Sequence, residues 1–302
     1  MITPVKDVET PLFVRKDDRQ IVYFNSQYHL VDYIQGLHDQ KGGVLSKKED
    51  SDKQWVFGTE FDSPEKTRAA IEGGMIGDKL KANTEIIMSA VEGLEELQVQ
   101  NQAAKSMKRH RKYSDDGGEL DIDRYLSGME EHWYSVTKGL QRPVVRLGVN
   151  YAMSCGNSED SWAWMGALVG IAAQMLSRAG LSVEVVGLFS SHNLTDQCKE
   201  SAVVYTLKEA MESLDIYRIM SPSAVGFFRY YGFGVYRHCF DGYVDDALGY
   251  ARGTTPEFKK ILNLDHVLEI SWGREKEKNQ KLCVDFLTSL HRQIIEPNYH
   301  GT

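Results

Sequence analysis

The sequence predicts an α/β fold: a doubly wound, mostly parallel, Rossmann-like sheet with an N-terminal helical or α+β extension. Two observations support this class. From residue 143 to the C-terminus, β-branched runs alternate with amphipathic runs. The clearest strands, residues 143–149 and 182–188, are separated by one helical run at 158–179. A strand–helix–strand unit of this kind predicts parallel neighbouring strands joined by a right-handed crossover.

The N-terminal region is expected to cover residues 1–98. Its β-prone run at 21–24 predicts a strand, and a helical pattern follows directly. The stretch 62–65, Asp-Ser-Pro-Glu, has a capping residue, a first-turn proline and a glutamate, and it predicts a helix to about Glu72. A third amphipathic pattern covers 77–98.

The later elements continue the alternation. Pro143 leads the first strong strand, and Gly180 ends the helix that follows it. Further strands are expected at 201–207, 233–238 and 266–271, and further helices at 214–220, 222–231 and 275–295.

Residues 99–119 mark the expected boundary before the α/β domain at 120–302, because they contain few apolar side chains. Within them lies a basic run whose candidate nucleic-acid contacts are Lys108, Arg109, Arg111 and Lys112. Two interpretations stay open: a solvated linker, or a short segment that binds phosphates. Tyr113 is the one aromatic residue at this run, so no stacking platform for single strands is indicated.

Composition narrows the class of protein. The chain has 302 residues, 42% of them hydrophobic, which is globular rather than disordered. No window approaches the roughly 18 apolar residues of a membrane span, and the N-terminus lacks a signal-peptide core, so a cytoplasmic protein is expected. The net charge of −8 provides no global attraction for nucleic acid or anionic membranes. The four cysteines are far apart, which indicates free thiols.

The loop after the first strong strand, residues 150–157, is the main candidate site, because ligands bind beyond the carboxyl ends of the strands in open α/β sheets. Its candidate binding residues are Asn150, Ala152, Ser154 and Cys155. The loop matches no phosphate-binding glycine motif. A catalytic Cys155 needs a histidine base, and His192 after the next strand is a conceivable partner. The alternative is a buried structural thiol.

Arg229 is a second candidate, for an anion or a partner protein. It lies in the aromatic stretch 227–233, so the alternative is a guanidinium packed on a ring and paired with an acid.

Residues 144–188 resemble the opening β-α-β unit of a von Willebrand factor A (VWA) domain. In that family the first strand ends in Asp-x-Ser-x-Ser, part of an adhesion site that holds a divalent cation. Here the corresponding residues are Asn150, Ala152 and Ser154. A neutral carboxamide is a poor replacement for a carboxylate on a hard cation, so the resemblance implies a degenerate, weak site for Mg²⁺ or another divalent ion at Asn150 and Ser154. Asp215, Asp245 and Asp246 are further ligand candidates by position.

The chain also resembles an uncharacterised family of phage and bacterial proteins with a degenerate VWA-like domain. The matching segments are residues 55–59, 71–77, 121–128, 144–188 and 227–233. This resemblance implies a VWA-like core with an N-terminal extension, located in the host cytoplasm if the protein is phage-encoded. It implies no established activity.

Three hypotheses about function follow. The first is a non-enzymatic module that binds a protein partner through the loops at the sheet edge. The second is a nucleic-acid-associated protein that uses residues 105–112. The third is an enzyme with a metal or a thiol at the 150–157 loop. No membrane partner is expected.

Overall fold

The computed structural model divides the chain into two compact units. Residues 1–94 and 144–302 form the large unit, and residues 95–143 form the small unit. The described residues are 4–41, 64–73, 81–89, 111–114, 119–120, 124, 127, 133–136, 144–152, 159–195, 198–223, 227–240, 254–269 and 276–295.

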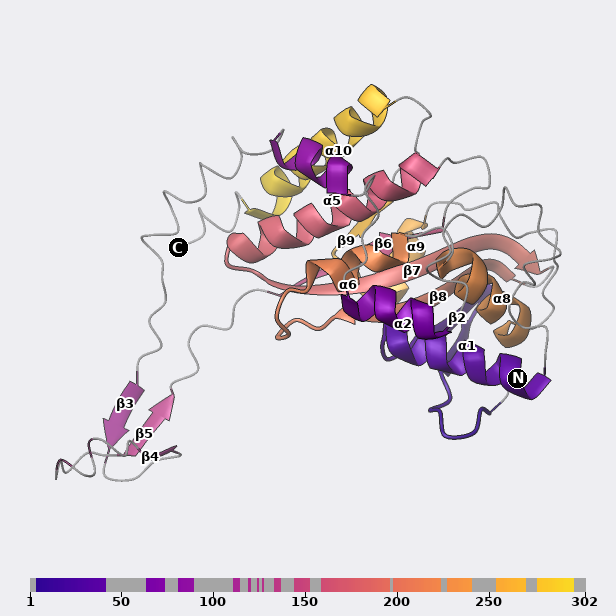
Figure 1. Cartoon of the computed structure of the whole chain (residues 1–302), viewed down its shortest axis with the longest axis horizontal. Coiled ribbons are helices and arrows are strands. Elements are labelled where there is room, and N and C mark those ends of the chain that lie inside the picture. Colours follow the sequence, from indigo (N-terminus) through magenta and orange to yellow (C-terminus); the bar gives the residue numbers. More distant parts are fainter. Residues whose placement is uncertain are drawn as a thin grey trace. The chain divides into compact units, whose positions relative to one another are not determined.

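A six-stranded sheet forms the centre of the large unit, in the order β1-β2-β8-β7-β6-β9 (Figure 1). β6 pairs in parallel with both β7 and β9, and β2 pairs in parallel with β8. The pairs β1–β2 and β7–β8 are antiparallel. The strands are β1 (Leu12–Lys16), β2 (Arg19–Phe24), β6 (Val144–Asn150), β7 (Ser182–Thr195), β8 (Cys198–Lys208) and β9 (His266–Leu268).

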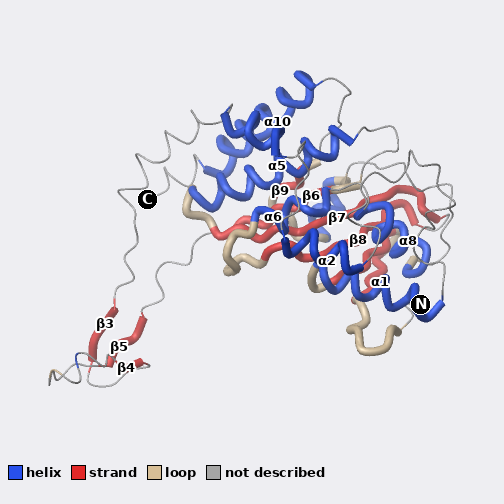
Figure 2. Tube along the Cα trace, viewed as in Figure 1, coloured by secondary structure: helices blue, strands red, loops and turns tan. Residues whose placement is uncertain are grey.

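Helices surround this sheet (Figure 2). α5 is apolar on almost every side and is buried along nearly its whole length, and α10 lies against it. The helices are α1 (Gln27–Lys41), α2 (Pro64–Gly73), α5 (Glu159–Arg178), α6 (Ile216–Met220), α8 (Phe233–Cys239), α9 (Pro256–Ile261) and α10 (Lys276–Leu290). A 3₁₀ turn at Ser221–Ser223 and π-helices at Phe228–Gly232 (η3) and His291–Ile295 complete the set, with residues 81–89 also helical.

The sheet buries both of its faces. Alternate strand residues such as Leu147, Val149 and Val203 belong to a large core cluster with residues of α1, α5 and α10. Other strand residues, among them Val186 and Ala202, belong to a smaller cluster that includes Phe258 of α9. This period-two division is what a strand with two covered faces requires.

Several predicted elements are confirmed. The strand–helix–strand unit is present as β6–α5–β7, and its two strands are parallel. Gly180, after α5, has φ +82°, a left-handed conformation that glycine adopts without strain. The predicted strands at 21–24 and 266–271 and the helices at 64–72 and 275–295 are present within a few residues of the expected bounds.

β8, which follows β6 and β7 in the chain, runs antiparallel to β7, whereas a mostly parallel sheet was expected. β7 and β8 run on past their predicted ends, so only residues 196–197 separate them. A parallel connection needs a crossover of about a dozen residues, so this short link makes an antiparallel hairpin.

The predicted strand at 233–238 is wrong, because these residues form α8. Its β-prone aromatic composition favoured a strand. Val235, Tyr236 and Cys239 are buried at helical spacing, and the Tyr236 hydroxyl donates to the carbonyl of Phe189. Packing of one helical face therefore overrides local propensity. The described residues of the helix expected at 222–231 are helical, but in other forms: residues 222–223 lie in a 3₁₀ turn and residues 228–231 in the π-helix η3, which continues directly into α8 beyond the expected end at Gly232.

The division of the chain also differs from the expected boundaries at 98 and 119. β1 and β2 belong to the same sheet as the later strands, because β2 pairs with β8 from Arg19↔Glu200 to Phe24↔Tyr205. The N-terminal region is therefore part of the α/β unit rather than an extension beside it.

The small unit contains a three-stranded antiparallel sheet in the order β3-β5-β4. Its strands are β3 (Arg111–Ser114), β4 (Glu119–Leu120) and β5 (Trp133–Val136). β3 lies inside the stretch that the sequence predicted as a linker. Among the described residues of both units, no helix has the length and apolarity needed to cross a membrane.

Candidate functional site

The carboxyl ends of β6, β7 and β9 meet at one edge of the large sheet, called here the carboxyl edge. The chain leaves β6 through α5 and returns as β7 on one side, whereas β9 joins β6 from the other side. Such a reversal of strand order is where open α/β sheets bind ligands. β2 and β8 begin at the same edge, because β8 is antiparallel to β7.

Asn150, the last residue of β6, is held from both ends of its side chain. Its Nδ2 donates to Oγ of Ser190 on β7 at 2.6 Å. Its Oδ1 accepts from the backbone N–H of Ala152 at 3.1 Å and of Ser190 at 3.4 Å. The side chain is 4% exposed, so the carboxamide is used inside the protein. A side chain with both a donor and an acceptor fits this position.

The rest of the predicted loop site is only partly within the described residues. Ala152 is buried, and the Tyr151 hydroxyl beside it donates to the carbonyl of Ile219 at 2.6 Å. Ser154 and Cys155 lie outside the described residues. Asp215 accepts from the backbone N–H of Arg218 and caps α6. Asp245 and Asp246 lie outside the described residues, and in the described part no three acidic, histidine or cysteine side chains form a metal-binding group.

Glu200 on β8 forms a second polar centre at the carboxyl edge. Its Oε2 accepts from Nε of Arg19 at 2.9 Å and from Oγ1 of Thr255 at 2.8 Å. Its Oε1 accepts from the Thr255 backbone N–H at 3.2 Å. Thr255 is the N-cap of α9, and its Oγ1 in turn accepts from the N–H of Phe258. One buried carboxylate therefore joins β2, β8 and α9.

Two more charged contacts flank Glu200. Nε2 of His192 lies 3.6 Å from Oε1 of Glu200. Lys199 pairs with Asp18 at 2.7 Å, and this hydrogen bond lowers the pKa of Asp18. His192 thus lies at the carboxyl edge, as the sequence predicted, but its neighbour there is the Glu200 carboxylate.

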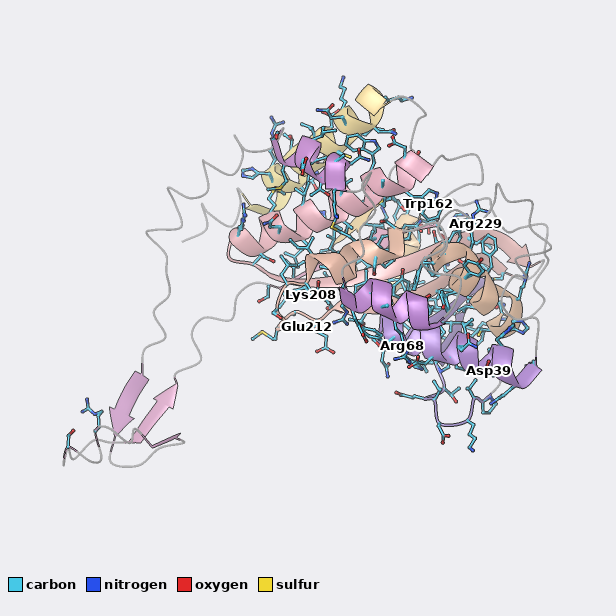
Figure 3. All side chains as sticks on the ribbon, viewed as in Figure 1. Asp39, Arg68, Trp162, Lys208, Glu212 and Arg229 are labelled. Carbon is cyan, nitrogen blue, oxygen red and sulfur yellow. The ribbon has the colours of Figure 1, made fainter. Side chains whose placement is uncertain are left out.

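Arg229 is buried, with 7% of its surface exposed, in η3. Its guanidinium carbon lies 6.0 Å from the centre of the Phe233 ring. The ring of the preceding Phe228 packs on the ring of Trp162 in α5, with their centres 5.9 Å apart. Figure 3 shows Trp162 and Arg229 in the packed part of the large unit. This placement favours the packing interpretation of Arg229 over a surface contact for a partner.

Three thiols are buried in the core. Burial raises the pKa of Cys198, and it raises the pKa of Cys239 and of Cys283 to about 12. Sγ of Cys198 donates to the carbonyl of Glu200 at 3.0 Å. A protonated, buried thiol is a structural group rather than a nucleophile.

The opposite edge of the sheet holds a buried lysine. Nζ of Lys208 donates to the carbonyls of Val183 at 2.8 Å and Glu209 at 2.9 Å. Burial lowers the pKa of Lys208, and the nearby Glu212 opposes that shift (Figure 3). Because both of these hydrogen bonds go to backbone carbonyls, Lys208 connects the start of β7 to the end of β8.

The candidate nucleic-acid residues are divided by the structure. Arg111 and Lys112 belong to β3 of the small unit. Lys108 and Arg109 lie outside the described residues. The large-unit candidates at the carboxyl edge therefore belong to a different compact unit from the described basic candidates.

Sequence reasoning missed Glu200, Arg19 and Thr255. A signal was present: Glu200 interrupts a strand that is otherwise mostly apolar, and a buried carboxylate requires partners. The pattern Thr255-Pro256-Glu257 is also a helix start. What the sequence did not contain was the pairing of β2 with β8, which brings Arg19 beside Glu200.

Comparison with known proteins supplies one family. Residues 15–292 match the model of a domain of unknown function, DUF7192. No curated protein and no solved structure gives a significant match. Because the match covers most of the chain, the protein belongs to the DUF7192 family.

Proposed function

We propose that this protein is a non-enzymatic protein-interaction module with a VWA-like core, which presents the carboxyl edge of its large sheet to a protein partner. The observation that carries the proposal is the pair of internal polar clamps at that edge, Asn150–Ser190 and Glu200–Arg19–Thr255. They hold the ends of β6, β7, β8, β2 and α9 in one arrangement. A rigid edge from which loops emerge is a common design of binding surfaces.

The VWA-like core is supported by β6–α5–β7 and by the parallel strands on both sides of β6. A cation-independent contact is favoured by Asn150, whose carboxamide is engaged by Ser190 and Ala152. The degenerate Mg²⁺ site and the thiol-dependent enzyme at Ser154 and Cys155 are the competing proposals, and the experiment below separates them from the interaction module.

The experiment compares two exposed positions at opposite edges of the sheet. A photo-crosslinking amino acid replaces Lys199, 80% exposed at the start of β8, or Met211, 89% exposed beyond the end of β8. Each full-length variant is irradiated in cells that encode the protein, with and without a chelator in the subsequent purification. One protein adduct of near-unit stoichiometry at position 199, and none at 211, is expected.

Equal labelling at both positions contradicts a specific carboxyl-edge surface, as does the absence of an adduct at 199. The metal-dependent site is supported instead if an adduct forms at position 199 and the same complex, purified without irradiation, dissociates when the chelator is added. Thermal unfolding of each variant checks that the substitution leaves the fold intact.

A further inference from the structure

We propose that residues 4–11, called here the strap, close over α1 while the imidazole of His29 is neutral and open when that imidazole is protonated. The strap is the segment directly before β1. The proposal stands apart from the partner contact proposed for the carboxyl edge. It is carried by one geometric relationship: His29 uses one ring nitrogen as an acceptor and the other as a donor, and the donor binds the strap.

Apolar side chains seat the strap on the large core. Val5 is 7% exposed, and Val8 packs against the same core cluster. Val5 occupies the space beside Gly36 of α1, where a methyl group on Gly36 would collide with Cγ1 of Val5. The absence of a side chain at Gly36 therefore lets the strap lie directly on the helix.

His29 holds the later part of the strap. Its Nδ1 lies 3.1 Å from the backbone nitrogen of Asn25, and its Nε2 lies 2.7 Å from the carbonyl oxygen of Glu9. Because a backbone N–H only donates, Nδ1 is the acceptor and the ring proton is on Nε2. The closed strap thus requires a neutral imidazole, which links the start of α1 to Glu9.

The ring of His29 has a fixed place at the start of α1. Its backbone N–H donates to Oγ of Ser26 at 3.1 Å, and the ring packs edge-on against Phe24 with the centres 5.3 Å apart. Turning the ring over does not rescue the contact after protonation, because both nitrogens of an imidazolium are donors. Protonation therefore places two donors, the imidazolium and the Asn25 N–H, against each other.

Glu9 is the charged residue that contacts this cluster within the described part of the chain. Its Oε2 accepts from Nδ2 of Asn25 at 2.7 Å. Its charge attracts an imidazolium and so opposes opening, but Glu9 and Asn25 are both exposed, and water screens the attraction. The other charged groups nearby on these segments are Lys6 and Asp7 in the strap and Asp32 on the next turn of α1, and Asp32 is paired with Arg68 of α2.

Opening of the strap changes the surface of the large unit. Val5, Val8 and the space at Gly36 become accessible together, which adds apolar surface beside α1. Imidazoles change charge between about pH 5 and 8, so this surface forms on mild acidification.

The test attaches a nitroxide spin label at Lys6→Cys in the full chain, which also carries Cys155→Ser, and records electron paramagnetic resonance spectra at about pH 7.5 and 5.5. Lys6 is exposed, and Cys198, Cys239 and Cys283 are buried. The ratio of mobile to immobile label should rise about 5-fold on acidification, which corresponds to the loss of one hydrogen bond. A label at Glu257→Cys on α9 should not change, which separates opening from unfolding.

Four variants assign the response. His29→Gln keeps an acceptor and a donor at every pH, so it should abolish the response, whereas the matched control His38→Gln, on the same helix, should keep it. Glu9→Gln removes the opposing charge and should enlarge the response. Gly36→Ala displaces Val5 and should give a mobile label at both pH values, which defines the spectrum of the open strap.

Three results overturn the proposal: an unchanged ratio in the wild type, a full response in His29→Gln, or an equal change at the Glu257→Cys label. If His29→Gln does not fold, or is mobile at both pH values, nitrogen NMR of the His29 ring in the wild type decides instead. Protonation of the ring and opening of the strap should then share one pH midpoint, and separate midpoints contradict the proposal.

Discussion

The carboxylate of Glu200 on β8 accepts a hydrogen bond from Nε of Arg19 at 2.9 Å, although the two residues are 181 positions apart in sequence. The same carboxylate binds the N-cap residue of α9, Thr255. A single side chain thus connects the N-terminal hairpin to the later half of the sheet.

Glu200→Gln should reduce the free energy of unfolding by about 2–3 kcal/mol, because it removes the charged acceptor and leaves Arg19 and Thr255 with a weaker one. Urea denaturation measures the change. Glu257→Gln, an exposed carboxylate on α9, is the matched control and should change stability by less than about 0.5 kcal/mol. Additive effects of Glu200→Gln and Arg19→Gln would argue against the coupling.

Asn150→Ala should lower the free energy of unfolding by about 1–3 kcal/mol. The variant removes the acceptor of the Ala152 and Ser190 backbone N–H groups and the donor to the Ser190 hydroxyl. Ser190→Ala should be less than additive with it. Calorimetric titration of the wild type with Mg²⁺, Mn²⁺ and Ca²⁺ should give no saturable heat, because the carboxamide is already engaged. Saturable binding that Ser154→Ala abolishes contradicts this prediction.

Tyr205→Phe should leave stability unchanged or raise it slightly. The Tyr205 hydroxyl is buried and has no hydrogen-bond partner among the residues that the structure describes, so its removal relieves a desolvation cost. Gly187→Ala should instead cost about 1–3 kcal/mol, because the added methyl group would lie 2.8 Å from the Tyr205 hydroxyl oxygen and collide with the ring. Thermal denaturation of both variants and of the double variant measures these effects.

Cys198, Cys239 and Cys283 should not react with a thiol reagent at pH 8 in the folded protein, because burial raises the pKa of each thiol. The variant Cys155→Ser should therefore show no labelling until denaturant is added. Labelling of this variant at a rate typical of exposed thiols contradicts the buried assignment. Wild-type labelling then reports on Cys155 alone, which tests the thiol-dependent hypothesis.

Stability should fall as the pH falls through 6.5. Burial lowers the pKa of His238 and of His266 from 6.5, with Lys41 and Arg237 adding to the shift at His238. The folded state therefore favours neutral imidazoles, and the unfolded chain binds more protons below pH 6.5. Chemical denaturation from about pH 7.5 to 5 should show a shallower decline in the variant His238→Gln, His266→Gln. An unchanged slope contradicts the assignment.

Local sequence patterns were sufficient for the centre of the large unit. The alternation of β6, α5 and β7, the apolar character of α5 and the glycine that ends it all follow from short-range periodicity. The α8 segment was mistaken for a strand because aromatic and β-branched residues favour both a strand and a well-packed helix.

Within the candidate site the structure describes Asn150 and Ala152, whereas Ser154 and Cys155 lie outside the described residues. Asn150 and His192 lie at the carboxyl edge, as strand order implied. The hydrogen bond between Asn150 and Ser190 depends on how β6 pairs with β7. The position of His192 beside Glu200 depends on the hairpin register between β7 and β8. Register is set by tertiary packing and turn length, which composition does not encode.

The sequence by itself determined an α/β class, a buried central helix and a parallel pair of strands, because these depend on periodicities of 2.0 and 3.6 residues within single segments. Only the tertiary structure decided that the N-terminal hairpin joins the same sheet, that β8 runs antiparallel to β7, and that Tyr113 is opposite Tyr134. Those outcomes depend on pairing between segments far apart in the chain, where each strand edge offers the same backbone donors and acceptors and the choice of partner is made by packing.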